Sequence, residues 1–226
     1  MNIALILSGG KGTRLGADKP KQYIFVDQKP IITYCLETFS DHSSIDAIQI
    51  VAETSWYRFI FDNWYSEKFK GCSVPGENRQ LSIYNGLCDI RKYASDNDVV
   101  IIHDAARPNV SPQMISECIM AAREHDGAIP VLPMKDTVYF SNNGTCISSL
   151  LPREKLYAGQ APEAFRLGRY LSANEKLLPD MIKSINGSTE PAIMDNMDVA
   201  IINGDEKNLK ITTADDLERF KEMVKK

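Results

Sequence analysis

Short apolar runs alternate with longer amphipathic stretches along the 226 residues. The runs have the length of buried strands, and the stretches between them carry apolar residues at helical spacing. Strands separated by helices predict βαβ units, so we expect one α/β domain over residues 1–226 with a mostly parallel sheet. The predicted strands are Ile3–Leu7, Ala47–Val51, Val99–His103, Ala128–Leu132 and Val199–Ile202, and the predicted helices are Pro30–Phe39, Trp56–Glu67, Arg79–Tyr93, Pro112–His125 and Ala214–Val224.

A glycine-rich segment, residues 8–16 (SGGKGTRLG), follows the first predicted strand. Its four glycines let the backbone turn sharply and bring N–H groups close to an anion, which favours a phosphate site. It matches neither the dinucleotide pattern, which needs a third glycine, nor the Walker A pattern, because Gly12 follows Lys11. A glycine-rich turn with solvated lysines is the alternative. Nearby positive charge comes from Lys11, Arg14, Lys19 and Lys21.

A carboxylate and a guanidinium follow the predicted strand Val99–His103. Asp104 stands at the carboxyl end of that strand, where it could hold Mg²⁺, and Arg107 could grip a phosphate by two parallel hydrogen bonds. A local Asp–Arg ion pair would explain the same residues. We interpret His103 as a packed strand residue, because its neighbours supply no second His or Cys for a metal site.

Two further segments carry candidate residues. Gly76 ends a short predicted strand and a helix begins near Asn78, which places Ser82 just over one turn into the helix and facing the glycine loop. An ordinary capped helix would give the same pattern. Lys210 lies between apolar residues just before the last helix, either as an exposed charge or as a third cation of the site.

The helical and strand periodicity weakens over residues 134–156. Two short β-type segments there, around residues 137–140 and 146–147, flank the turn Ser141-Asn142-Asn143-Gly144. We therefore expect a β-hairpin arm that projects from the main sheet within the single domain.

Composition argues against several classes of partner and compartment. Lys and Arg number 26 against 30 Asp and Glu, so the formal net charge of −4 provides no basic field for nucleic acid or a membrane surface. The apolar runs fall short of 18 residues, so we expect a cytoplasmic protein that does not span a membrane. The five cysteines are scattered and form no C-x-x-C pair, which is typical of reduced thiols: Cys35, Cys72, Cys88, Cys118 and Cys146.

Five ordered motifs together resemble one family over nearly the whole chain. They are similar to those of the cytidylyltransferases of the methylerythritol-phosphate pathway and of their teichoic-acid relatives, which act on ribitol 5-phosphate. The motifs are residues 8–14 with 20–23, Gly76-x-x-Arg79-x-x-Ser82, residues 103–108, Lys135-Asp136-Thr137 and residues 208–212.

The resemblance implies a Rossmann-like, mostly parallel sheet and a homodimer in which each arm reaches over the partner's site. It also implies a reaction in which CTP and a polyol phosphate give a CDP-polyol and pyrophosphate with Mg²⁺. The substrate phosphate is already an anionic nucleophile, so the chemistry needs positioned cations rather than a general base.

The resemblance also implies a role for each matching residue. Arg14, Lys21 and Lys210 would be the catalytic cations around the α-phosphate. Ser8, Gly9, Gly10, Gly12, Gly76, Ser82 and Ala105 would bind CTP. Asp104 would bind Mg²⁺ and, with Arg107, Thr137, Arg153, Thr189 and Glu190, the polyol phosphate, with Thr137 and Arg153 acting in the partner's site.

The acceptor half departs from the family pattern. Residues 160–163 read Gln-Ala-Pro-Glu where the family usually has Gln-Thr-Pro-Gln, and Thr189-Glu190 replaces Thr-Asp. These changes favour a small polyol phosphate, of ribitol or glycerol type, used for a surface polymer. Methylerythritol 4-phosphate is the alternative acceptor. A nucleotide-binding regulator without catalysis is disfavoured, because Arg14, Lys21, Asp104 and Lys210 are all present.

Overall fold

The computed structural model describes residues 1–10 and 19–225. Within them an eight-stranded sheet has the order β10-β7-β11-β6-β1-β4-β5, with β12 also paired to β7. Four strand pairs are parallel and three, all involving β10 or β11, are antiparallel. The strands are β1 Asn2–Leu7, β4 Ala47–Val51, β5 Phe69–Ser73, β6 Val99–Asp104, β7 Gly127–Pro133, β10 Tyr157–Gly159, β11 Glu163–Arg166 and β12 Val199–Asn203.

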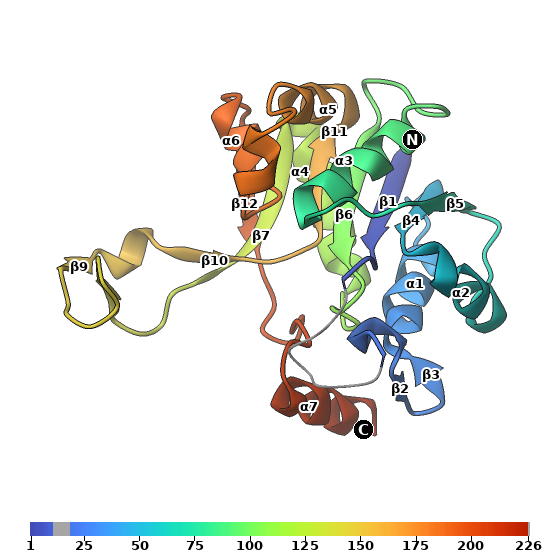
Figure 1. Cartoon of the computed structure of the whole chain (residues 1–226), viewed down its shortest axis with the longest axis horizontal. Helices are drawn as coiled ribbons and strands as arrows, with labels where there is room; N and C mark the ends of the chain where they lie inside the picture. Colours follow the sequence, from blue (N-terminus) through green and yellow to red (C-terminus); the bar gives the residue numbers. More distant parts are fainter. Residues whose placement is uncertain (11–18, 226) are drawn as a thin grey trace.

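Seven α-helices are described, and most of them cover the two faces of this sheet (Figure 1). Alternate residues of β1 point to opposite faces, as a pleated strand requires: Ala4 and Ile6 pack with α1, α2 and α4, whereas Ile3 and Leu5 pack with α3 and α5. The helices are α1 Ile31–Asp41, α2 Tyr57–Asn63, α3 Arg79–Ile90, α4 Pro112–Glu124, α5 Leu167–Glu175, α6 Glu190–Met194 and α7 Ala214–Val224.

Helix α7 lies away from the sheet and has a small core of its own (Figure 1). Its Leu217 and Phe220 pack against Ile31 and against Leu209 and Ile211, the neighbours of Lys210. Burial of these two neighbours holds the Lys210 segment in place. Close to this core, β2 Phe25–Val26 and β3 Lys29–Pro30 form a short hairpin.

Side chains cap the first turn of three helices. The side chain of Asn78 accepts from Leu81 N at α3, and Ser111 caps α4 with Pro112 in the first turn. Thr213 and Asp216 form a capping box at α7. These caps satisfy backbone N–H groups that a helix leaves without a partner.

The predicted parallel sheet is confirmed, and the predicted strands match β1, β4, β6, β7 and β12 to within one residue at each end. The sequence pattern does not reveal β11, although it separates β6 from β7. Its four residues are too few to show a period, and the charged Glu163 and Arg166 stand at its ends. The predicted helix 56–67 is too long, since α2 ends at Asn63.

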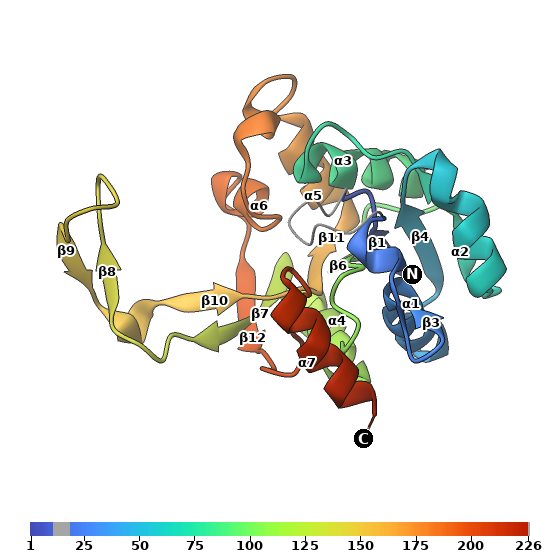
Figure 2. The ribbon, with the colours of Figure 1, turned by 60° about the horizontal axis from the view of Figure 1, so that its bottom comes forward.

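Residues 134–156 leave the sheet as an extended arm (Figures 1 and 2). Within it, β8 Val138–Phe140 pairs antiparallel with β9 Ser149–Leu151, and the register joins Val138 to Leu151. Five large apolar side chains of the arm are exposed to solvent: Met134, Tyr139, Phe140, Ile147 and Leu150.

None of the helices in residues 1–10 and 19–225 combines the length and the apolar character that a membrane crossing needs.

Candidate active site

A cavity of about 560 Å³ opens at the carboxyl ends of the parallel strands β1 and β6. Parallel strands bring these ends to one edge, so Gly9 and Asp104 meet there although they are far apart in sequence. Two carboxylates besides Asp104, those of Glu53 and Glu77, also line the cavity. The remaining lining residues are Leu7, Gly10, Lys21, Gln22, Gly76, Asn78, Arg79, Ser82, Ala106, Lys210 and Thr212.

The described start of the glycine loop is held by the short 3-10 helix Lys21–Tyr23. Gln22 Nε2 donates to the carbonyls of Ser8 (2.6 Å) and Gly10 (2.9 Å), and the Ser8 hydroxyl donates to Tyr23 Oη (2.8 Å). Tyr23 in turn stacks on Trp56 with ring centroids 4.2 Å apart. This packing leaves the backbone of Gly9 and Gly10 facing the cavity and places Lys21 beside it.

Glycine is required where the two loops of the cavity approach other parts of the chain. A Cβ on Gly9 would lie 2.5 Å from Pro75 Cβ, and a Cβ on Gly76 would overlap both the side chain and the backbone of Leu81. The Gly76 N–H donates to Ser82 Oγ (3.0 Å), which itself donates to the Asn78 carbonyl (2.8 Å). Ser82 therefore shapes the loop at Gly76 as well as lining the cavity.

Asp104 is the centre of charge at the site. Its Oδ1 accepts from Arg79 Nη2 (3.1 Å) and Nε (3.3 Å), and its Oδ2 lies 2.8 Å from Lys210 Nζ. The Nε of Arg107 is 3.7 Å from the same Oδ2. Burial alone would raise the pKa of Asp104, but these three cations outweigh burial and hold that pKa well below its usual range.

Arg107 is held by one hydrogen bond from its side chain and by another to its backbone carbonyl. Its Nη1 donates to the Asn208 carbonyl (2.7 Å), and its own carbonyl accepts from His103 Nε2 (2.9 Å). Because a carbonyl can only accept, His103 carries its proton on Nε2. Burial lowers the pKa of His103 to about 4, so the ring stays neutral at pH 7, as expected for a packed strand residue.

A second carboxylate, Glu163, lies behind Arg79 at the start of β11. The register pairs Glu163 with Ile102, so the antiparallel strand begins at the edge where β6 ends. Its Oε1 accepts from Ser188 Oγ and its Oε2 from Thr189 Oγ1 (2.7 Å), while Arg79 Nη1 donates to Ser188 Oγ (2.7 Å). Burial raises the pKa of Glu163, against the opposing effects of Arg79 and the two hydroxyls.

The structure brings together part of the predicted set. Gly9, Gly10, Lys21, Gly76, Ser82, Asp104 and Lys210 all line the cavity. Arg14 and Gly12 lie outside the described residues. The Ser8 hydroxyl donates its hydrogen bond to Tyr23 and is not among the lining residues. Ala105 is packed in the core, and its neighbour Ala106 lines the cavity instead. Arg107 does not line the cavity but lies beside Asp104.

The remaining acceptor-side residues lie away from the lining of this cavity. Thr189 binds Glu163, and Glu190 accepts from the backbone N–H groups of Asn186 and Gly187. Thr137 and Arg153 are exposed on the arm, where Arg153 Nη1 donates to the Lys135 carbonyl (2.6 Å). Their roles in binding substrate stay predictions.

Sequence reasoning missed the part played by Arg79, Glu163 and Ser188. Arg79 belongs to the motif Gly76-x-x-Arg79-x-x-Ser82 and is the first residue of α3. A positive charge at that position, next to the loop at Gly76, could have indicated a role in the site. Ser188 carried no signal, because it reaches Arg79 only through the fold, across 109 positions of the chain.

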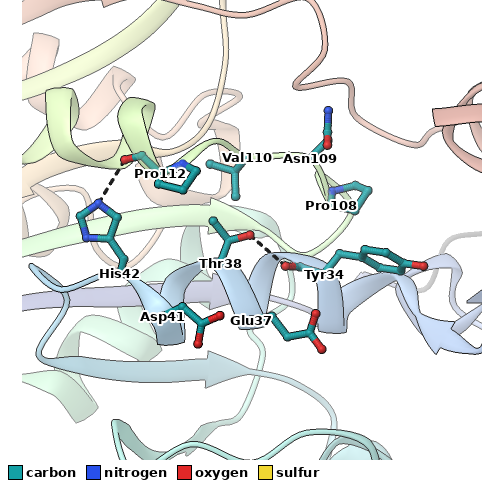
Figure 3. A pocket seen from close by; sticks show the side chains of 9 residues that line it. All are labelled: Tyr34, Glu37, Thr38, Asp41, His42, Pro108, Asn109, Val110 and Pro112. Atoms are coloured by element: carbon teal, nitrogen blue, oxygen red, sulfur yellow. Dashed lines mark hydrogen bonds between the residues drawn. The ribbon is translucent and has the colours of Figure 1, made fainter. Parts of the chain in front are cut away.

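A second cavity of about 420 Å³ lies between α1 and the segment that follows β6 (Figure 3). His42 reaches across it and donates from Nε2 to the Pro112 carbonyl (3.1 Å). Glu37 and Asp41 are the charged groups of its described lining, so it does not suit an anionic ligand. The cation-lined cavity at Asp104 is therefore the candidate active site.

Comparisons with known proteins show the family of this chain. The model of the IspD family, 2-C-methyl-D-erythritol 4-phosphate cytidylyltransferase, matches residues 2–226. A ribitol-5-phosphate cytidylyltransferase from Streptococcus agalactiae is 32% identical over 98% of this chain and 94% of its own. A 2-C-methyl-D-erythritol 4-phosphate cytidylyltransferase from Rubrobacter xylanophilus is 34% identical over 95% of this chain and 91% of its own.

Solved structures give the same result for the fold. The chain is similar to 2-C-methyl-D-erythritol 4-phosphate cytidylyltransferase from Francisella tularensis, with a TM-score of 0.83, 26% identity and 97% of each chain covered. It also shares the fold of the 4-diphosphocytidyl-2C-methyl-D-erythritol synthase from Anaerococcus prevotii, with a TM-score of 0.85 at 24% identity over 100% of this chain and 96% of that one.

Fold, site and comparisons define the class of protein: this chain is a nucleotidyltransferase of the cytidylyltransferase type. It belongs to the IspD family, as the matching motifs predicted.

The charge balance at Asp104 gives a prediction for stability against pH. Asp104→Asn leaves Arg79, Arg107 and Lys210 facing one another, so we expect the free energy of unfolding at pH 7 to fall by about 1–3 kcal/mol. Because the folded pKa is depressed, this stability is complete above the ordinary Asp pKa of about 3.9 and is lost as pH falls below it. Urea unfolding of both proteins from pH 7 to pH 3 measures the difference.

The two stability curves should run parallel down to about pH 5 and converge in more acid solution. Asp180→Asn is the matched control, since Asp180 is an exposed carboxylate that pairs with Lys183 three residues along the chain. A gap between wild type and Asp104→Asn that stays constant down to pH 3 would contradict the assigned ion pairs.

Proposed function

We propose that this enzyme transfers CMP from CTP to a small polyol phosphate of ribitol or glycerol type, giving a CDP-polyol and pyrophosphate for the synthesis of a surface polysaccharide or a teichoic-acid-like polymer. The observation that carries the proposal is the cavity lined by Lys21, Arg79 and Lys210, of which Arg79 and Lys210 pair with Asp104. Two highly charged substrates need this concentration of cations. The ribitol-5-phosphate cytidylyltransferases among the relatives support the choice of acceptor.

In the proposed reaction an oxygen of the acceptor phosphate attacks the α-phosphorus of CTP. The new P–O bond forms as the bond to the bridging oxygen of the β-phosphate breaks, and the electron pair leaves with pyrophosphate. The nucleophile is already an anion, so no side chain has to remove a proton. The glycine backbone at Gly9 and Gly10 binds the triphosphate, and Lys21, Lys210 and Arg14 offset the charge that builds on the α-phosphate.

Mg²⁺ fits this arrangement as a partner of the triphosphate. Among the described residues no three His, Cys, Asp or Glu side chains are grouped to hold a metal ion, and both oxygens of Asp104 face cations. Mg²⁺ commonly takes one or two carboxylates together with phosphate oxygens and water, so Asp104 would supply the protein ligand by exchanging one of its contacts with a cation for the metal ion. When bound, the ion neutralises phosphate charge.

A second acceptor is supported by other relatives. Methylerythritol 4-phosphate cytidylyltransferases from Rubrobacter xylanophilus and Clostridium tetani are each 34% identical to this chain. On this reading the enzyme serves isoprenoid synthesis. The CTP half of the site is the same in both cases, so the two functions differ in the acceptor alone.

The acceptor is identified by incubating the purified enzyme with CTP and Mg²⁺ and with one phosphate at a time while pyrophosphate release is followed. We expect ribitol 5-phosphate or glycerol 3-phosphate to give a kcat/KM at least about tenfold above that of methylerythritol 4-phosphate. Turnover of methylerythritol 4-phosphate alone would overturn the preferred acceptor and leave the cytidylyl transfer intact.

Lys21 offers a test of transition-state stabilisation. Lys21→Ala should lower kcat by about 100-fold to 1000-fold, because the charge that it meets develops in the transition state. The Kd for CTP, measured by calorimetry, should change by less than about tenfold. Lys19→Ala is the control: Lys19 is exposed and lies over the Phe25 ring, so kcat should stay within about twofold. Equal losses in kcat and CTP affinity would make Lys21 a simple CTP ligand.

We also propose that the enzyme is a homodimer in which the arm, residues 134–156, completes the partner's site with Thr137 and Arg153. The exposed Tyr139, Phe140 and Leu150 support it, because an isolated two-stranded hairpin with apolar side chains in water is marginal without a packing partner.

Mixing two inactive variants tests this arrangement. Arg153→Ala disables the arm and Lys210→Met disables the site beneath it, so each mixed dimer contains one intact site. Random exchange of equal amounts should restore about a quarter of wild-type activity. The control pair, Lys21→Ala with Lys210→Met, should restore none, because each site keeps one defect. Failure of the first pair to recover, in a sample that light scattering shows to be dimeric, would place Arg153 outside the partner's site.

A further inference from the structure

Gln22 connects the first residues of the glycine loop to the wall of the cavity. Its side chain is buried, with 3% exposure, and the residue belongs to the cavity lining. The short 3-10 helix Lys21–Tyr23 presents it, directly after Lys21. The reaction described above gives Gln22 no part, so its role has to be read from the groups that its amide binds.

The orientation of the Gln22 amide follows from its partners. Nε2 lies 2.6 Å from the Ser8 carbonyl oxygen and 2.9 Å from the Gly10 carbonyl oxygen. Carbonyl oxygens only accept, so the NH₂ group must face them, and its two protons serve the two carbonyls. The Ser8 carbonyl also receives a longer bond from Tyr23 Oη, at 3.3 Å. Two carbonyl oxygens of the loop are therefore tied to the 3-10 helix.

These bonds fix the direction of the peptide group between Ser8 and Gly9. In a planar trans peptide the N–H points away from the C=O, and this peptide is trans. Since the Ser8 carbonyl points to Gln22, the Gly9 N–H points to the opposite side. Among residues 1–10 and 19–225 no group accepts from this N–H, and Gly9 lines the cavity. A backbone N–H in that position is a donor for an anion.

We propose that Gln22 is a positioning residue for the triphosphate: by binding the Ser8 and Gly10 carbonyls it keeps these oxygens from the phosphates and aims the Gly9 N–H at them. The inference rests on the proposed function, because the anion is the triphosphate of CTP. It adds the residue that sets the polarity of the loop. A peptide group held in advance binds charge without having to reorient, whereas a free one would also present its repulsive carbonyl.

The substitution Gln22→Met keeps the length of the side chain and removes its two donated hydrogen bonds. We expect the Kd for CTP to rise by about tenfold to a hundredfold, the equivalent of one hydrogen bond to a charged group. The Kd for inorganic triphosphate should rise by the same factor, and that for cytidine, which has no phosphate, should stay within twofold. Calorimetry measures the first two values, and competition with CTP measures the third.

Gln49→Met is the matched control. Gln49 lies on β4, is likewise 3% exposed and donates from Nε2 to Ser73 Oγ at 2.9 Å, but it is not among the lining residues of the cavity. This variant loses a buried hydrogen bond of the same kind and should keep all three Kd values within twofold. Equal losses for triphosphate and cytidine in Gln22→Met, no loss for triphosphate, or the same pattern in Gln49→Met would overturn the proposal.

The wild-type chain supplies a test that needs no variant and no acceptor. Ser8-Gly9 is the only Ser-Gly pair in the sequence, so cell-free synthesis with carbonyl-¹³C serine and ¹⁵N glycine gives one HNCO resonance. Inorganic triphosphate should move its Gly9 proton downfield, since that N–H gains an acceptor. A proton that stays in place while triphosphate binds would overturn the inference.

The same resonance reports on Gln22 and keeps the inference separate from the proposed function. In Gln22→Met the Ser8 carbonyl signal should move upfield before any ligand is added, because it loses a donor, and an unmoved signal would overturn the assigned contact. If wild type shows the expected affinities and shifts but turns over no polyol phosphate, the proposed acceptor fails while the role of Gln22 stands.

Discussion

The Asp104 carboxylate joins three segments that are far apart in the chain. It binds Arg79 at the start of α3 and Lys210 just before α7, and it stands itself at the end of β6. A carboxylate with so little exposure is costly unless cations or hydrogen bonds meet it, so the three segments stabilise the folded state together. The same ion pairs hold Arg79 and Lys210 in the lining of the cavity. The interactions that stabilise this region therefore also position the cations that could bind an anion.

The strand β11 extends this charge network to a second layer. Because it runs antiparallel between β6 and β7, its first residue, Glu163, lies at the edge where the parallel strands end. A parallel strand in that place would have put its last residue there instead. The reversal therefore brings a carboxylate behind Arg79, where Ser188 links the two. The acceptor side of the proposed site is thus built from a different part of the chain than the CTP side.

The arm and the body of the domain are stabilised in different ways. The body buries its strands between two layers of helices, whereas β8 and β9 keep Tyr139, Phe140 and Leu150 in solvent. Lys135 of the arm pairs with Glu206 of the body, and within the arm the Lys135 carbonyl accepts a hydrogen bond from Arg153. Such a segment gains stability when a second molecule covers its apolar face, and this is the physical basis of the proposed dimer.

The sequence alone determined the parallel sheet and the positions of its main strands, because these depend on local periodicity. It also identified the family through ordered motifs that span the chain. It left Lys210 undecided between an exposed charge and a site cation, and tertiary structure decided this by placing it 2.8 Å from Asp104. Contacts between distant segments follow from strand order and direction, which no local pattern encodes. For that reason the hydrogen bonds that link Glu163 through Ser188 to Arg79 became visible only in the folded protein.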